Sequence, residues 1–114
     1  MSVKLTTRQV GEVTVVDAAG RITLGEGAST FRDTLRDLAG SGKKKLLLNL
    51  GEVSYIDSSG IGEMVSGFTT VTNAGGQVKL LNLTKRVKDL LQITKLYTVF
   101  EVFEDEAAAV RSFS

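Results

Sequence analysis

Cysteine, histidine, proline and tryptophan are all missing from this sequence of 114 residues. Without cysteine the chain has no disulfide and no thiolate ligand for zinc. Without histidine it has no imidazole metal ligand and no base for a Ser-His-Asp or Cys-His arrangement. Most hydrolase and metalloenzyme classes are therefore excluded, and we expect a protein that is not an enzyme, with no catalytic residue, cofactor or metal site.

Long hydrophobic runs and a surplus of one charge are lacking as well. No window approaches the roughly 18 apolar residues of a membrane span, and the first ten residues have no apolar core of signal-peptide length. The net charge of +1 gives no basic surplus for binding a nucleic-acid backbone. With an ordinary apolar content of 42%, the sequence predicts one globular domain over residues 1–114, located in the cytoplasm, with no direct nucleic-acid contact.

The amino-terminal part has the composition of β-strands. Residues 3–8 and 12–19 are β-branched-rich runs separated by Gln9-Val10-Gly11, a pattern that predicts an antiparallel hairpin. Gly20 is expected to end the second strand, and residues 21–27 to form a loop with two glycines. The chain therefore begins with two paired strands.

Helices and strands alternate through the rest of the chain. Apolar residues at helical spacing predict one helix from Ala28 to the glycine at position 40 and another over residues 61–71. A third helix is expected after Thr84 and a fourth over the tail from residue 104. The strands between them are expected at residues 46–50, 77–83 and 98–103. The order β-β-α-β-α-β-α-β-α predicts a single α/β domain with a mixed sheet, in which an amino-terminal hairpin is followed by mostly parallel strands.

The segment Ile56-Asp57-Ser58-Ser59-Gly60-Ile61-Gly62 lies between a predicted strand and a predicted helix. In an α/β sheet, this carboxyl edge of the strands is where ligands and partners usually bind. A dinucleotide fingerprint needs a third glycine where Val65 stands, and a nucleophile elbow needs glycines on both sides of its serine. No P-loop sequence is present either. Enzymatic interpretations of the segment are therefore disfavoured.

Two interpretations of this segment remain. In the first, a side chain of Asp57, Ser58 or Ser59 caps the following helix, and Gly60 and Gly62 permit a tight turn into it. In the second, an exposed hydroxyl at the helix start accepts a phosphate, which gains from the free amides and the helix dipole. The two are compatible, so the physical hypothesis is a phosphoserine switch at a capped helix start.

The sequence resembles the anti-sigma factor antagonist family, the small single-domain members of the sulphate transporter and anti-sigma factor antagonist (STAS) group. The resemblance extends over nearly the whole chain, and its most specific part is D-S-S-G-I-G at residues 57–62, after an apolar strand. AAGRIT at residues 18–23 and the segment from GGQVKLLNL to TVFEVF at residues 75–103 support it. The resemblance implies a STAS-like fold and a bacterial regulator of transcription that works by partner switching.

The resemblance also implies a mechanism. In this family the unmodified antagonist binds a serine kinase of the histidine-kinase-like ATPase type, which is the anti-sigma factor, and so frees the sigma factor. Phosphorylation ends that binding, and a serine phosphatase of the metal-dependent type restores it. By position the phosphoacceptor is Ser58, with Ser59 as the second candidate. The expected partner-binding residues are Asp57, Ser59, Gly60, Ile61 and Gly62, together with Gly20, Arg21, Ile22 and Thr23 of the preceding loop.

This chain departs from its relatives in that loop. Many of them have an acidic Gly-Glu-Leu-Asp-like segment after the second strand, where this chain has Gly20-Arg21-Ile22-Thr23. The departure leaves the identity of the partner open, though not the fold. Two other functions also stay open: an unphosphorylated STAS scaffold in a larger signalling or lipid-transport assembly, and a small nucleotide-binding module with Arg8, Arg21 and residues 85–88 at a strand-end cleft.

Overall fold

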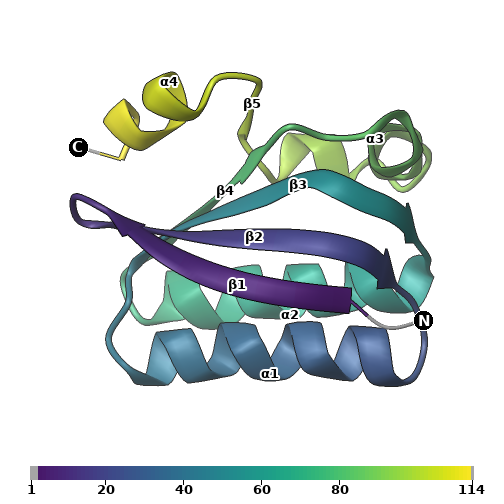
Figure 1. The fold of residues 1–114 in the computed structure, drawn as a ribbon, viewed down its shortest axis with the longest axis horizontal. Helices are drawn as coiled ribbons and strands as arrows, with labels where there is room; N and C mark the ends of the chain where they lie inside the picture. Colours follow the sequence, from purple (N-terminus) through teal and green to yellow (C-terminus); the bar gives the residue numbers. More distant parts are fainter. Residues whose placement is uncertain (1–2, 114) are drawn as a thin grey trace.

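The computed structural model describes residues 3–113 as a five-stranded sheet with four α-helices (Figure 1). The strands are β1 (Val3–Val10), β2 (Val13–Ile22), β3 (Lys45–Ile56), β4 (Gln77–Leu81) and β5 (Val102–Phe103). The helices are α1 (Glu26–Gly40), α2 (Ser58–Asn73), α3 (Lys85–Ile93) and α4 (Glu106–Arg111), with a short 3₁₀ turn, η1 (Leu96–Thr98). The strands lie in the order β1-β2-β3-β4-β5; β1 is antiparallel to β2, and all other neighbours are parallel. The predicted α/β order and the amino-terminal hairpin are confirmed.

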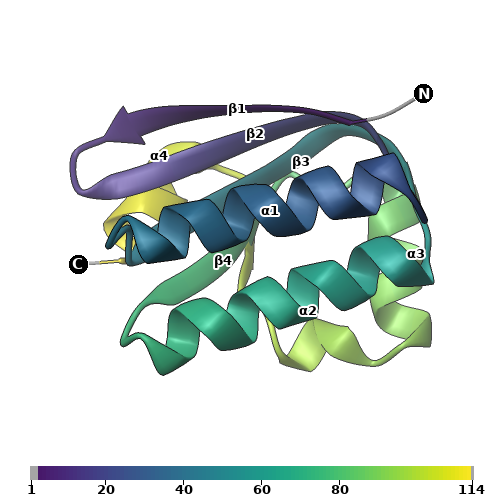
Figure 2. The ribbon, with the colours of Figure 1, turned by 90° about the horizontal axis from the view of Figure 1, so that it is seen from below.

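Helices cover the sheet from two sides. In Figure 1, α1 and α2 lie below the sheet, and α3 and α4 lie above opposite ends of it; Figure 2 shows α1 and α2 side by side across the lower face. The larger core joins these two helices to the sheet, with Phe31 of α1, Met64 of α2 and Leu48 of β3 completely buried. Leu47 points to the opposite face and packs into a smaller core with Phe113. The apolar run in β3 is therefore covered on both sides, as predicted.

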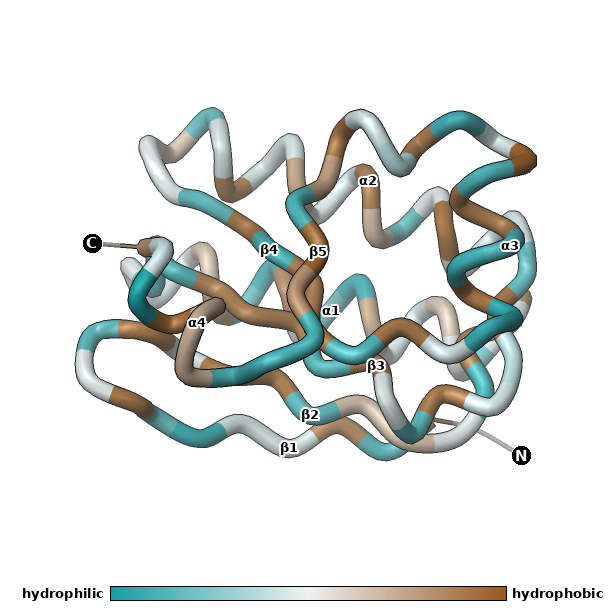
Figure 3. Tube along the Cα trace, turned by 90° about the horizontal axis from the view of Figure 1, so that it is seen from above, coloured by the Kyte–Doolittle hydropathy of each residue, from teal (hydrophilic) through white to brown (hydrophobic). Residues whose placement is uncertain are grey.

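The helices are amphipathic rather than uniformly apolar. Along α3, brown and teal segments alternate in Figure 3, and Val87 and Leu91 are its buried residues. Thr84 caps this helix, because its Oγ1 accepts a hydrogen bond from Val87 N at 3.4 Å. The third helix and its cap are thus confirmed, and Lys85, Arg86 and Lys88 lie on its exposed side. Within residues 3–113, no helix has the length and apolar content needed to cross a bilayer.

The ends of β2 and β3 differ from the sequence prediction. β2 does not end at Gly20 but continues to Ile22, so Gly20, Arg21 and Ile22 belong to the sheet rather than to a loop. β3 likewise continues past its apolar run to Ile56. The reason is that the two strands stay paired in parallel across two register shifts, up to the pair Ile22↔Ile56.

The last two strands are shorter than predicted. β4 ends at Leu81, because Asn82 has a positive φ of 58° that no longer fits a strand. The expected strand over residues 98–103 is reduced to β5, because Lys95 with φ 62° turns the chain into η1. On the side away from β3, β4 is therefore paired with only the two residues of β5.

Lys79 of β4 anchors the carboxyl-terminal segment. It is only 6% exposed, and its Nζ donates to the carbonyl and hydroxyl oxygens of Ser112, both at 2.9 Å. The same ammonium group lies 4.8 Å from the centroid of the Phe113 ring. Since Ser112 follows the last turn of α4, the lysine places a positive charge at the negative end of that helix.

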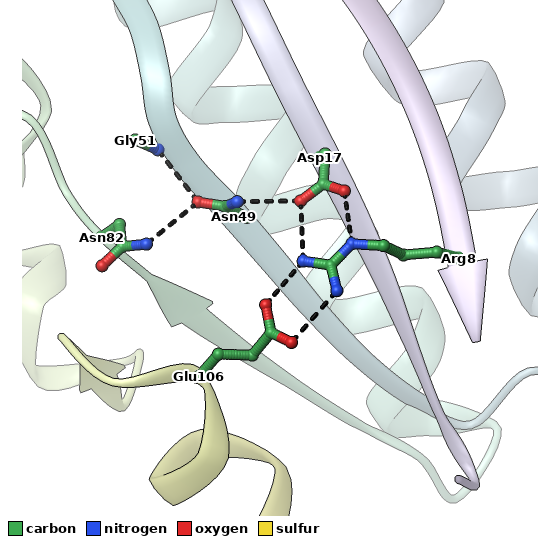
Figure 4. A network of polar contacts seen from close by, with 6 residues as sticks. All are labelled: Arg8, Asp17, Asn49, Gly51, Asn82 and Glu106. Carbon is green, nitrogen blue, oxygen red and sulfur yellow. Dashed lines mark hydrogen bonds and ion pairs between the residues drawn. The ribbon is translucent and has the colours of Figure 1, made fainter. Parts of the chain in front are cut away.

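A network of polar contacts ties α4 to the first two strands (Figure 4). Arg8 of β1 contacts Asp17 of β2 (Nε–Oδ2, 2.6 Å) and Glu106 of α4 (Nη2–Oε1, 2.6 Å). Asp17 also accepts a hydrogen bond from Asn49 Nδ2 at 2.8 Å. Hydrogen bonds from the Arg8 guanidinium hold the pKa of Asp17 and the pKa of Glu106 below their usual values. The first strand and the last helix are therefore joined through one arginine.

Glu106→Gln should lower the free energy of unfolding at pH 7 by about 0.5–1 kcal/mol, a modest loss because the ion pair is partly exposed. Since the pKa values of both carboxylates are lowered in the folded protein, their stabilisation is complete above the ordinary carboxylate pKa of about 4 and is lost as the pH falls through the folded-state values. Urea denaturation should therefore show a difference between wild type and Glu106→Gln that shrinks from pH 7 to pH 3. Glu104→Gln, outside the network, is the control; a difference that stays constant with pH would contradict the assignment.

Candidate functional site

The Asp57–Gly62 segment lies where β3 ends and α2 begins, beside the end of β2. Asp57 N donates to Ile22 O at 3.3 Å, which extends the Ile22–Ile56 pairing by one residue. The ends of β2 and β3 and the starts of α1 and α2 meet at the right-hand end of the molecule in Figure 1. The expected arrangement of strand, segment and helix is confirmed.

Asp57 is the residue that caps α2. Its Oδ1 accepts a hydrogen bond from Gly60 N at 3.0 Å, and its Oδ2 accepts one from Leu24 N at 2.9 Å. Burial raises the pKa of Asp57, but the hydrogen bonds from backbone amides, chiefly those of Leu24 and Gly60, together outweigh that effect, so the pKa lies below its usual value. One carboxylate therefore holds both the start of α2 and the β2–α1 loop.

Asp57→Asn should lower the free energy of unfolding by about 1–2 kcal/mol, because two backbone donors point at its two oxygens and an amide can accept from only one of them. Since the pKa of Asp57 is lowered by folding, the stabilisation is present above about pH 3.9 and is lost as the pH falls through the folded-state pKa. Urea denaturation at pH 7 measures the effect. Asp37→Asn, on the exposed side of α1, is the matched control, and equal stability of the two variants would contradict the dual role of Asp57.

Ser58 and Ser59 do not cap the helix. Ser58 is the first residue of α2 and is exposed, whereas Ser59 is half-buried. Within residues 3–113 the Ser58 hydroxyl takes part in no hydrogen bond, so no internal contact must break before it reacts. The free amides and the positive dipole end of α2 lie beside it, which favours a phosphate at this position.

Gly60 and Ile61 face the interior of the protein. A Cβ atom on Gly60 would lie 2.3 Å from Ile22 O, so only glycine lets α2 begin this close to β2. Ile61 is 4% exposed and belongs to the larger core. Gly62, in contrast, is exposed, and a Cβ atom there would meet nothing within 4 Å. Gly62 is therefore accessible to a partner, whereas Gly60 and Ile61 hold the segment in place through their packing against the interior.

The expected contact residues at and after the end of β2 also divide into accessible and buried ones. Arg21 is exposed, Gly20 and Thr23 are half-buried, and Ile22 is completely buried. The Ile22 side chain therefore offers no surface for a partner. Its contribution is the backbone oxygen that Asp57 N and Gly60 approach.

Sequence reasoning missed Leu24 and Tyr55 beside the segment, and it considered Arg86 only as part of residues 85–88 in a possible nucleotide site. Leu24 is 80% exposed and follows Thr23 directly. The one sequence feature that could have pointed to it is an apolar residue in a loop with two glycines. Two charged groups lie over the Tyr55 ring: its centroid is 5.2 Å from the guanidinium carbon of Arg21 and 4.2 Å from that of Arg86. Arg86 comes from α3, and only the folded chain brings it to β3.

A mixed five-stranded sheet with this strand order, and with an exposed serine at a capped helix start, defines a STAS-type α/β domain. The model of the STAS domain family matches residues 4–109, and the chain belongs to that family. The anti-sigma-B factor antagonist of Bacillus subtilis is 34% identical over 102 residues, which cover 90% of this chain and 92% of that protein.

Solved structures share the same fold. An anti-sigma factor antagonist from Mycobacterium paratuberculosis has a TM-score of 0.87 at 15% identity, covering 98% of this chain and 94% of that chain. The Bacillus cell fate determinant SpoIIAA in its phosphorylated form has a TM-score of 0.77 at 18% identity, covering 97% of this chain and all of that chain (100%). At these identities the two structures show that the fold is shared and show nothing about function.

Proposed function

We propose that this chain is an anti-sigma factor antagonist whose partner binding is switched off by phosphorylation of Ser58. In the unmodified state it binds an anti-sigma factor that is also a serine kinase of the histidine-kinase-like ATPase type, and the sigma factor is released. A metal-dependent serine phosphatase removes the phosphate and restores binding. The observation that carries the proposal is the exposed Ser58 hydroxyl at the first position of α2, which has no hydrogen bond to any other residue of the described range 3–113.

The relatives support this function. The Bacillus subtilis relative, which covers most of this chain, is named an anti-sigma-B factor antagonist. SpoIIAA, which has the same fold, is known in a phosphorylated form. In this chain Asp57 has both oxygens engaged by backbone amides, so it fixes the helix start while leaving the neighbouring hydroxyl accessible.

The physical basis of the switch is charge. A phosphate adds about −1.5 to −2 charges at pH 7, which in a packed interface brings desolvation cost and repulsion from nearby acids. The exposed Leu24 beside Asp57 is the kind of apolar surface that such an interface covers. Phosphorylation therefore acts at the point where partner and chain come closest.

Nucleotide binding has less support from the structure. A cleft of about 710 Å³ lies between β3, the start of α3 and the segment after β5, and its charged lining residues are Glu52, Glu104 and Lys88. Two carboxylates against one lysine disfavour the phosphate groups of a nucleotide. Neither Ser58 nor Arg21 lines this cleft.

Phosphate mapping by mass spectrometry tests the proposal. After incubation with ATP and an anti-sigma factor kinase of the source organism, we expect a single phosphate on Ser58. The phosphate should be lost in Ser58→Ala and retained in Ser59→Ala, which is the matched control one residue away. A phosphate that persists in Ser58→Ala, or none with any such kinase shown to be active on another substrate, would overturn the proposed switch.

A further inference from the structure

Three side chains from three elements meet beside the Ser58 segment. Arg21 at the end of β2 and Arg86 in the first turn of α3 have their guanidinium carbons 5.2 Å and 4.2 Å from the centroid of the Tyr55 ring. Tyr55 is the second-last residue of β3 and pairs with Arg21 in the parallel register. Contact with an aromatic ring limits where a guanidinium group can lie. This arginine–tyrosine site (Arg21, Tyr55 and Arg86) therefore holds two positive charges next to one ring.

Neither of these charges is neutralised by the fold. Within residues 3–113, Arg21 and Arg86 take part in no ion pair, whereas Arg8 and Arg32 each contact two carboxylates. Both arginines of the site are also exposed. Two like charges close together repel each other, and an external anion is what relieves that repulsion.

The arginine–tyrosine site is adjacent to the phosphoacceptor. Tyr55 precedes Ser58 by three residues, and Leu24, which is hydrogen-bonded to Asp57, follows Arg21 by three residues. A typical protein interface covers roughly 800 Å² and about 20–30 residues on each partner. An interface of that size centred on Ser58 is wide enough to include the arginine–tyrosine site.

We infer that the arginine–tyrosine site binds the carboxylates of an acidic patch on the protein partner that is seated on Ser58. The inference rests on the proposed function and specifies the charge of the partner's surface. Guanidinium groups bind carboxylates through paired hydrogen bonds, and arginine and tyrosine are among the residues that most often carry interface affinity. The site thus selects partners by charge.

A protein surface fits this site better than a small anion does. Arg21 and Arg86 are exposed, and the clefts of about 710 Å³ and 240 Å³ are lined by other residues, so the charges lie on open surface. A small anion there keeps much of its water and gains little from binding. A protein excludes that water, and the exposed Leu24 offers it an apolar contact beside the charges.

The first experiment uses a deca-glutamate peptide as the probe and does not depend on a kinase. In an NMR titration at about 20 mM ionic strength, we expect shifts of the Arg21 and Arg86 Nε–H signals and of Tyr55, and a loss of these shifts at about 300 mM salt. Arg36, an exposed arginine in the second half of α1, is the internal control and should not shift. Equal shifts at Arg36, or larger ones at Lys43–Lys45, would overturn the inference.

The second experiment measures the affinity of the unmodified chain for its anti-sigma factor kinase. The double variant Arg21→Glu/Arg86→Glu should bind about 100-fold more weakly and lose most of the salt dependence of binding. The affinity of Arg36→Glu should stay within about threefold of the wild-type affinity. Urea denaturation of each variant confirms that the fold is intact. Equal binding of wild type and double variant would refute the site while leaving the proposed function standing. A wild type that binds no kinase would refute the proposed function, and the peptide titration would still decide on the site.

Discussion

Gly60→Ala is expected to lower the free energy of unfolding by about 3 kcal/mol, although alanine usually favours a helix over glycine by about 1 kcal/mol. The added Cβ would lie 2.3 Å from Ile22 O and 2.7 Å from Cγ1 of Ile56. The carbonyl group belongs to the end of β2 and also accepts a hydrogen bond from Asp57 N, so it cannot move without opening the junction of strand and helix. The first turn of α2 must shift instead.

Gly62→Ala is the matched control for this prediction. It lies in the same helix two residues later, and its Cβ would meet no atom within 4 Å, so its stability should be unchanged or raised by up to about 1 kcal/mol. In urea denaturation the midpoint should therefore fall for Gly60→Ala and stay the same or rise for Gly62→Ala. If Gly60→Ala unfolded at the same urea concentration as Gly62→Ala, the close approach of α2 to β2 would not be a rigid feature of the fold.

The order of the elements could be predicted from the sequence because each element carries its own periodicity. The apolar run at residues 46–50 stands between polar segments, and the buried residues Phe31 and Leu35 fall four apart on one helix face. The ends of β2 and β3 could not be predicted in the same way. Gly20 and Gly51 have the local signature of strand breakers, but each stays in the sheet because the neighbouring strand continues beside it through two register shifts.

The candidate site was predictable only in its local part. Asp57 and Ser58 could be assigned to a helix start from their order in the sequence, and Asp57 caps α2 in the structure. The inward orientation of Gly60 depends on how closely α2 packs on Ile22, which is 38 positions away in the chain. The contact of Arg86 with Tyr55 depends likewise on the packing of α3 against β3. Tertiary packing, not local pattern, decides these two roles.

Ser58→Asp should raise the dissociation constant for the anti-sigma factor kinase by about 100-fold, which corresponds to roughly 3 kcal/mol. The substitution places a negative charge where the partner is expected to bring its own carboxylates to Arg21 and Arg86, so the two surfaces repel each other. Ser58→Asn, which has the same size without the charge, is the matched control and should weaken binding by less than about tenfold.

The same charge should have the opposite effect on the isolated chain. Ser58 is the first residue of α2, where a carboxylate interacts favourably with the helix dipole, so Ser58→Asp should raise the free energy of unfolding by about 0.3–1 kcal/mol. A loss of binding together with a gain of stability separates repulsion at the interface from damage to the fold. Isothermal titration calorimetry and urea denaturation of the same three samples measure both effects. Retention of wild-type affinity by Ser58→Asp would show that charge at this position does not control the partner, since the added carboxylate faces the same surface as the phosphate.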